Sequence, residues 1–374
     1  MKVYYPEKEW LQVNPAEVGI NKEAVSHAEK ELHINNSIIG MMVVKDGYIV
    51  LEQYNPRYDE DTVSQTFSVT KSFISALFGI ACSMGLIDSI NDPVYKYFPE
   101  YQPKADRFLQ KTVTLRHLLT MTAGLYVSKR RSFGSRIEDS SEWVRNIMEL
   151  PISLKTANEF HYNDLYPHLI SALISRQSGI STIDFANKFL FSKLNMNKIV
   201  PLQTKNALDY ALFNKIADET VQRGSSLWPC DPEGIPVGGF GLMTTLRDMA
   251  RFGYLYLRNG KWGDTQVIPE EWISESTVAL TDTGKRTALS AIMNEKDAEE
   301  PGEDNAVGVE GYGYYWWISE GNIKYYCALG YGGQRIIVIP SQNIVIAIKT
   351  TYSGMNEYLH ADRLWQKIVL DSLA

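Results

Sequence analysis

Ser68 and Lys71 are the first residues in this sequence whose types and spacing could carry nucleophilic chemistry. A serine hydroxyl attacks a carbonyl carbon poorly until a neighbouring group activates it. Residues three apart on a helix share one face, so the lysine amine would lie beside the hydroxyl. Lys71 is the only cation between Arg57 and Lys96, in a mostly apolar stretch, where a charge needs a specific partner. Because a Ser-x-x-Lys spacing arises by chance about once in a chain of this length, an ordinary surface lysine is the alternative.

A tyrosine is the second candidate. Tyr162 lies in the segment 160–164, directly before a helical pattern that starts near residue 165. A tyrosine at the entry to a helix can project into a cleft, where a nearby lysine lowers the pKa of its phenol. The alternative is a packed aromatic ring whose hydroxyl is hydrogen-bonded.

The third candidate is the glycine-rich segment 328–334, which reads Ala-Leu-Gly-Tyr-Gly-Gly-Gln. Glycines inside a strand pattern indicate a bulge or the close approach of another group to the backbone. A strand edge whose N–H groups meet a substrate carbonyl would need that room. A plain glycine-rich turn is the alternative.

The elements that would position these residues fall into three parts, with strands near both ends and helices between them. Apolar alternation and the Asp46-Gly47 turn signal predict a hairpin early in the chain and consecutive antiparallel strands late in it. We therefore expect an α+β fold, in which an antiparallel sheet of about five strands is flanked by helices and carries an inserted all-helical lobe. Residues 1–62 and 225–374 would form the α/β lobe, and residues 63–224 the mainly helical lobe with Ser68, Lys71 and Tyr162. The predicted strands are 38–45, 48–54, 312–319, 323–329, 334–339 and 344–350, and the main predicted helices are 21–33, 67–84, 165–178, 245–259 and 356–372.

Composition narrows the class of protein. The chain has 374 residues and a formal net charge of -7, which argues against nucleic acid or an anionic membrane as the main partner, because both require a basic face. Its three cysteines make no disulfide framework, and no Cys/His pattern indicates a metal. We expect no cofactor. The first residues show no apolar signal segment and no run of 18 apolar residues occurs, so the cytoplasm is the expected location.

In this order, the three candidate segments resemble the active-site elements of the serine β-lactamase-like superfamily, which includes penicillin-binding peptidases, class C β-lactamases and related esterases. Three more stretches resemble the same family, at 85–94, 114–125 and 238–250. The resemblance spans about residues 38–350, which is most of the chain.

The resemblance implies a role for each matching residue. Ser68 would be the acylated nucleophile and Lys71 its activating partner. Tyr162 matches the tyrosine of the family's Tyr-x-Asn element, which relays protons during acylation and deacylation. The backbone N–H groups of Ser68 and Tyr331 would form the oxyanion hole.

Asp164 departs from the family pattern, because it stands where the Tyr-x-Asn element has asparagine. Its charge could hold Lys71 protonated, which would shift the role of base onto Tyr162.

Ala328 is the second departure, since the family's third element usually begins with lysine or histidine. That cation helps recognise the carboxylate of β-lactams and of peptidoglycan termini. With Gly330, Gly332 and Gly333 beside the substrate, the segment looks more like the branch of small-ester hydrolases and 6-aminohexanoate-dimer hydrolases. Arg335 could supply a substitute charge or, by strand alternation, face away.

Together these features predict a serine hydrolase that acts on a small ester or amide through an acyl-enzyme on Ser68. The alternative is a penicillin-recognising β-lactamase, DD-peptidase or slowly acylated sensor. A Ser-His-Asp triad using His117 or His161 is disfavoured, because no Gly-x-Ser-x-Gly elbow is present. The acidic segment 281–310 could be a surface loop that acts as a lid. The oligomeric state stays open.

Overall fold

The computed structural model describes residues 4–6, 9–101, 111–124, 140–153, 157–203, 222–283, 309–351 and 356–372. Most of the acidic segment 281–310, expected to be a surface loop and considered as a lid, lies outside the described residues, at 284–308.

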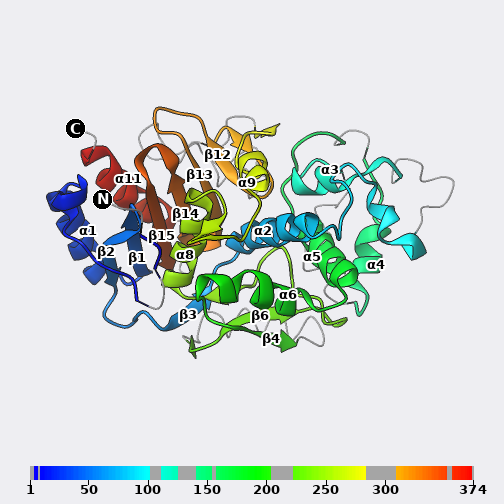
Figure 1. Cartoon of the computed structure of the whole chain (residues 1–374), viewed down its shortest axis with the longest axis horizontal. Coiled ribbons are helices and arrows are strands. Elements are labelled where there is room, and N and C mark those ends of the chain that lie inside the picture. The colour runs from blue at the N-terminus through cyan, green and yellow to red at the C-terminus, as the bar shows by residue number, and fades with distance from the viewer. Residues whose placement is uncertain are drawn as a thin grey trace.

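An eight-stranded antiparallel sheet forms the larger part of the fold, in the order β10-β11-β12-β13-β14-β15-β1-β2. Strand β1 pairs with β2 on one side and with β15 on the other, so strands from both halves of the chain form one sheet (Figure 1). The predicted fold class is confirmed, but the sheet has eight strands where about five were expected. The additional edge strands have two or three residues, which is too short to give a periodic pattern. The strands are β1 (Ile38–Lys45), β2 (Tyr48–Tyr54), β10 (Thr281–Asp282), β11 (Gly311–Tyr312), β12 (Trp317–Ser319), β13 (Tyr325–Gly330), β14 (Gln334–Ile339) and β15 (Ile344–Thr350).

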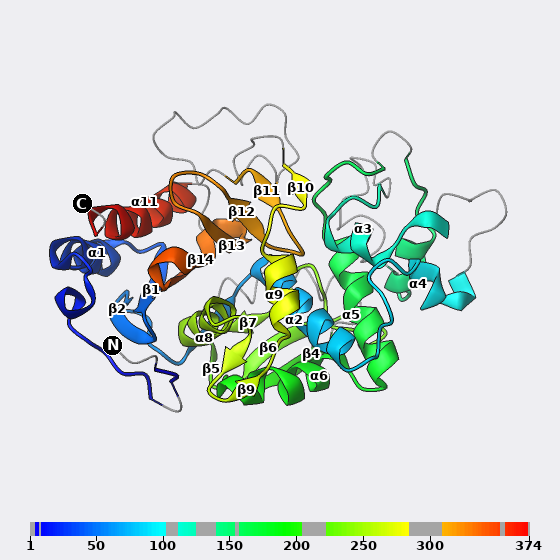
Figure 2. The same ribbon diagram turned by 45° about the horizontal axis from the view of Figure 1, so that its top comes forward.

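Helices cover both faces of this sheet. On one face, α8 (Leu246–Leu257) packs against β1, β14 and β15. On the other, α1 (Lys22–Ile34) and α11 (Asn356–Asp371) lie side by side (Figures 1 and 2). Successive side chains of β14 point to opposite faces of the sheet. Ile336 lies against α8, whereas Arg335 pairs with Asp362 of α11.

The second part of the structure is mainly helical and is joined to the sheet by α2 (Val69–Ser83), which runs through the middle of the molecule (Figure 1). It contains α3 (Leu115–Leu119), α4 (Trp143–Met148), α5 (Leu165–Ser178) and α6 (Thr182–Phe189). Helix α2 is buried from Val69 to Ala81, and Gly85 follows it with φ 70°. Within the described part of the chain, no helix has both the length and the apolar character to cross a bilayer.

A small second sheet lies beside the helical part, which the sequence had suggested to be all-helical. Its order is β4-β6-β7-β3-β5, and β4 and β6 run parallel. Strand β3 leads directly into the segment that carries Ser68. The strands are β3 (Thr62–Gln65), β4 (Ile199–Gln203), β5 (Gln222–Arg223), β6 (Ser226–Cys230) and β7 (Met243–Thr244).

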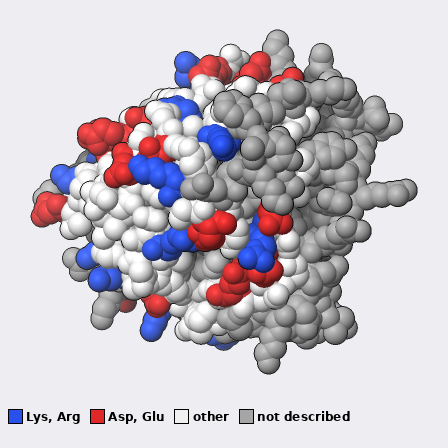
Figure 3. Space-filling model, turned by 90° about the vertical axis from the view of Figure 1, so that its right-hand side faces the viewer, with Lys and Arg blue, Asp and Glu red and all other residues white. Residues whose placement is uncertain are grey.

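Acidic and basic side chains are interspersed over the described part of the side shown in Figure 3. Some of these charges form exposed ion pairs in the helical part of the structure, for example Arg145 with Glu142 and Arg176 with Glu100. Such exposed pairs contribute little to stability, typically about 0–1 kcal/mol each.

Candidate active site

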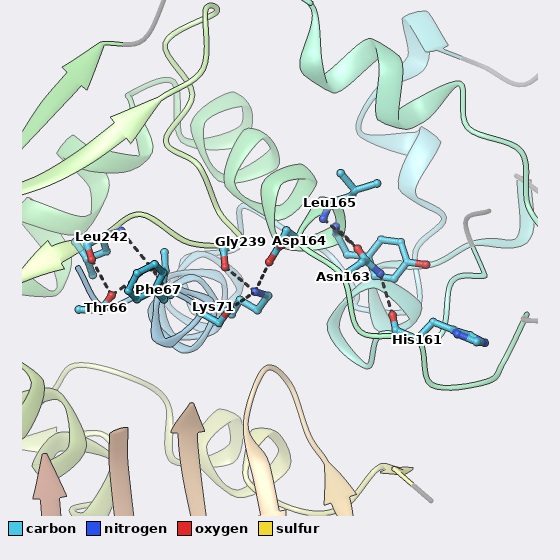
Figure 4. Close-up of polar contacts among 12 residues, drawn as sticks. Thr66, Phe67, Lys71, His161, Asn163, Asp164, Leu165, Gly239 and Leu242 are labelled. Atoms are coloured by element: carbon cyan, nitrogen blue, oxygen red, sulfur yellow. Dashed lines mark hydrogen bonds and ion pairs between the residues drawn. The ribbon is translucent and has the colours of Figure 1, made fainter. Parts of the chain in front are cut away.

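Ser68 is placed by a tight turn between β3 and α2. Phe67 has φ 48°, a left-handed conformation that costs a non-glycine residue about 1–2 kcal/mol. The turn is held by Thr66, whose N–H and hydroxyl both donate to the carbonyl of Leu242, and by Thr70, whose hydroxyl donates to Phe67 O at 2.6 Å (Figure 4). Ser68 itself is the N-cap of α2 and stays partly exposed. The positive end of the helix dipole therefore lies where a negative oxygen would develop.

Lys71 is one turn into α2, and its side chain is only 1% exposed. Its Nζ donates to three acceptors, which are Ser68 Oγ at 2.9 Å, Asp164 Oδ1 at 2.5 Å and the carbonyl of Gly239 at 2.6 Å (Figure 4). An ammonium has three hydrogens to donate, so each has a partner. Burial lowers the pKa of Lys71, but the charge of Asp164 and its hydrogen bond raise it, and the net direction is upward. The resting site therefore holds a charged Lys71.

Asp164 is free to face Lys71 because its neighbour takes over the capping of α5. Asn163 Oδ1 accepts the N–H groups of Leu165 and Tyr166, at 3.0 and 3.1 Å, whereas Asp164 makes no capping bond. A helix N-terminus needs such acceptors for its unpaired N–H groups. The Asn-Asp order thus separates the cap from the ion pair.

Tyr162 completes the group. It is buried, and Lys71 Nζ lies 4.6 Å from the centre of its ring. Burial raises the pKa of the phenol, while the positive charge of Lys71 opposes that rise, and the net direction is upward. The phenol is therefore protonated at rest. Ser68, Lys71 and Tyr162 thus come together in the structure.

The end of β13 lies against the turn that carries Ser68. A Cβ on Gly330 would collide with the carbonyl oxygen of Thr66, so only glycine allows this approach. The ring of Tyr331 meets that of Phe67 edge to face, with their centroids 5.9 Å apart. Gly332 and Gly333 follow with φ 77° and 103°, conformations that favour glycine. The backbone of Tyr331 is consequently next to the Ser68 turn.

Comparison with known proteins agrees with this architecture. The family model described as Beta-lactamase matches residues 25–370. The chain belongs to the beta-lactamase family. It is 21% identical over 319 residues to the 6-aminohexanoate-dimer hydrolase of Paenarthrobacter ureafaciens, a match that covers 82% of this chain and 70% of that one.

Two solved structures share the fold of this family. A Bacillus anthracis protein with the provisional name 6-aminohexanoate-dimer hydrolase superposes with a TM-score of 0.63 at 20% identity, over 91% of this chain and 80% of its own. The class C beta lactamase of Rhodobacter sphaeroides gives a TM-score of 0.63 at 14% identity, over 94% and 100%. At these identities the likeness supports the fold and not a substrate.

In this beta-lactamase family member, the position of the usual third-element cation is apolar. Ala328 is buried in β13, opposite Ile336 of β14. Arg335 faces away, because its guanidinium pairs with both oxygens of Asp362 at 3.0 and 3.1 Å. Lys349 is also engaged, since its Nζ donates to the carbonyls of Ser64 and Thr244, and burial lowers its pKa to about 7.

Aromatic rings, which the sequence reasoning missed as site residues, surround Tyr162 instead. The ring of Trp317 is 5.4 Å from that of Tyr162, Tyr312 is 6.2 Å away, and Phe160 contacts both of these neighbours. The aromatic run at 312–319 predicts a single strand. It is two short strands, because the loop 313–316 interrupts it.

The two histidines considered for a triad have other partners. His117 belongs to the capping box of α3 with Thr114, and His161 lies 3.6 Å from Glu159. Among the residues that the structure describes, no three His, Cys, Asp or Glu side chains are grouped to hold a metal ion. The polar groups gathered at Ser68 suit acyl transfer.

Proposed function

We propose that the protein is a serine hydrolase that cleaves small esters or amides through an acyl-enzyme on Ser68. The observation that carries the proposal is the placement of Lys71 Nζ 2.9 Å from Ser68 Oγ and beside the ring of Tyr162 at the start of α2. A nucleophile with an adjacent charged donor and a proton-relay group is the arrangement that covalent catalysis requires.

The reaction starts with the substrate carbonyl oxygen between the N–H groups of Ser68 and Tyr331. Ser68 Oγ bonds to the carbonyl carbon as its proton passes to the oxygen of Tyr162, and the proton of Tyr162 passes to the leaving group, whose bond to carbon breaks. Lys71 stays charged and stabilises the negative charge that develops on Ser68 Oγ. Water then attacks the acyl carbon, its proton moves through Tyr162, and Ser68 leaves with a proton.

Lys71 takes this electrostatic role because its three acceptors favour the ammonium. Neutral Lys71 as the base is the competing mechanism.

The substrate class follows from the walls of the site. Buried Ala328 and the paired Arg335 offer no charge for a substrate carboxylate, and the partly exposed Phe160 packs on the buried rings of Tyr312 and Trp317 behind it. An uncharged acyl group suits such walls better than the carboxylate of a β-lactam. The relative named 6-aminohexanoate-dimer hydrolase supports hydrolysis of amides within the same family.

Comparing three substrates tests this function. We expect kcat/KM for p-nitrophenyl butyrate to exceed that for nitrocefin at least about 100-fold. The reason is that a site without a cation to pair with the carboxylate of nitrocefin binds that substrate weakly. A linear amide dimer would show whether amides are accepted. Mass spectrometry of the protein after each substrate measures the adduct on Ser68, with Ser68→Ala as the blank. A persistent β-lactam adduct without ester turnover would instead identify the slowly acylated sensor.

Asp164→Asn tests the charge state of Lys71. Without the carboxylate charge, burial dominates and the pKa of Lys71 falls. If the ammonium is the working form, activity is lost as pH rises through that pKa, so the alkaline limb of the pH–rate profile should move to lower pH by at least about one unit.

Glu159→Gln removes a carboxylate that faces His161 rather than Lys71 and should leave the profile in place. A shift of the acid limb in Asp164→Asn, with faster turnover at neutral pH, would contradict the electrostatic role and establish neutral Lys71 as the base.

A further inference from the structure

A second polar pair lies entirely buried near the site. His168 of α5 and Asp231 have side chains that are both 0% exposed, and His168 Nε2 is 3.1 Å from Asp231 Oδ2. The ring of His168 packs against Trp143 of α4, with centroids 5.3 Å apart. His168 Nδ1 has no hydrogen-bond partner among the described residues, so within that part of the chain the imidazole is held by its hydrogen bond with Asp231. A buried polar pair that does no chemistry of its own calls for a reason.

Asp231 organises the turn that follows β6. Its Oδ1 accepts the N–H groups of Glu233 at 2.9 Å and Ile235 at 2.8 Å, and its own N–H donates to the carbonyl of Ile235 at 2.8 Å. With one oxygen on the turn and the other on His168, this carboxylate fixes the turn to α5.

From this turn the chain runs along α5 toward Lys71. Ser171, one turn beyond His168, donates to the carbonyl of Pro236 at 2.8 Å. A Cβ on Gly238 would collide with the carbonyl of Pro167, and one on Gly239 would come within 2.6 Å of Asp164 Cβ. The segment 231–239 is therefore in backbone contact with the start of α5.

We propose that His168 and Asp231 are positioning residues that hold the segment 231–239 so that the carbonyl of Gly239 accepts from Lys71. The inference rests on the proposed function, because the carbonyl of Gly239 matters for activity only if the Lys71 ammonium takes part in catalysis. The groups that face Lys71 are Ser68, Tyr162, Asp164 and that carbonyl, at the distances given above. Of these, the carbonyl of Gly239 is set by a segment anchored at Asp231. The ionisable groups beside His168 are Asp231 and Glu233.

The test removes both members of the pair, because one buried polar group left alone would unfold the protein for a trivial reason. The double variant His168→Phe with Asp231→Leu fills both positions with apolar side chains, and it also takes from the Glu233 and Ile235 N–H groups the acceptor that fixes the turn. We expect kcat for p-nitrophenyl butyrate to fall about 10- to 100-fold with KM within about 3-fold, since a displaced charge partner disturbs the reacting geometry. The alkaline limb should also move to lower pH, because the ammonium loses an acceptor.

Two further variants separate positioning from stability. Asp231→Asn keeps an oxygen for the two N–H groups, and its amide donates to His168 Nε2 once the imidazole carries its proton on Nδ1, so this variant should keep the wild-type kcat and pH profile. Ser175→Ala removes a hydrogen bond of the same helix to Thr182, away from the segment, and should change the melting temperature alone.

A folded double variant with wild-type kcat and pH profile would overturn the inference. A fall in kcat that is proportional to the fall in melting temperature in the double variant, in Asp231→Asn and in Ser175→Ala alike would also overturn it. Acylation of Ser68 in the wild-type protein is measured separately, so failure of the proposed function would be seen there and not mistaken for failure of the pair.

Discussion

Replacing Ser68 with alanine is expected to lower kcat/KM for p-nitrophenyl butyrate at least about 10⁴-fold, because no other group can form the covalent intermediate. The residue is the partly exposed N-cap of α2 and makes no capping bond with its side chain, and water can replace its hydroxyl as an acceptor for Lys71, so its removal should leave the melting temperature nearly unchanged. Steady-state kinetics and labelling by a fluorophosphonate measure the loss of activity, and thermal denaturation measures the melting temperature.

Ser83→Ala provides the matched control, since Ser83 ends the same helix and its hydroxyl donates to the carbonyl of Ile80. It should keep full activity and full labelling. Turnover of Ser68→Ala at a rate comparable to wild type, or a label on another residue, would remove the nucleophile assignment.

Removing the charge at Lys71 has the second largest expected effect. Lys71→Met alone would leave the carboxylate of Asp164 without its partner, at a cost below the about 3–5 kcal/mol of a fully buried broken pair because 29% of that side chain is exposed. The double variant Lys71→Met with Asp164→Asn removes both charges. We expect its kcat to fall about 10³-fold, as for the loss of an oxyanion-stabilising donor.

Lys349→Met makes the same change at a fully buried lysine that bonds two backbone carbonyls. It should lower the melting temperature yet leave Ser68 reactive toward the fluorophosphonate. If the double variant at positions 71 and 164 kept the wild-type kcat, Lys71 would have no part in the reaction.

Local spacing was enough to predict several features of the fold and the site. The positions of Ser68 and Lys71 follow from the helix repeat, and the Asp46-Gly47 turn forms with φ of 53° and 92°, as its residue types predict. Helix α2 and strands β1, β2, β14 and β15 lie where apolar periodicity placed them. Each of these signals is contained within a few neighbouring residues.

What could not be predicted depends on contacts between distant segments. The carbonyl of Gly239 reaches Lys71 from 168 positions away, and a glycine in a sequence carries no sign of which lysine it will meet. The direction of Arg335 depends on its partner Asp362, which lies far along the chain on α11. The parallel pair β4 and β6 joins segments whose own patterns are too short and mixed to indicate strands.

The seam between β1 and β15 affects how the protein is made. Strand β15 inserts between β14 and β1, so an N-terminal strand with seven buried residues must wait for partners about 300 residues downstream. During synthesis on the ribosome, the hairpin of β1 and β2 leaves the exit tunnel early, with the edge of β1 that later pairs with β15 still open, and such an edge is a template for association with other chains. A truncation before residue 344 would leave that edge permanently open, so such fragments should accumulate as aggregates rather than as smaller folded units.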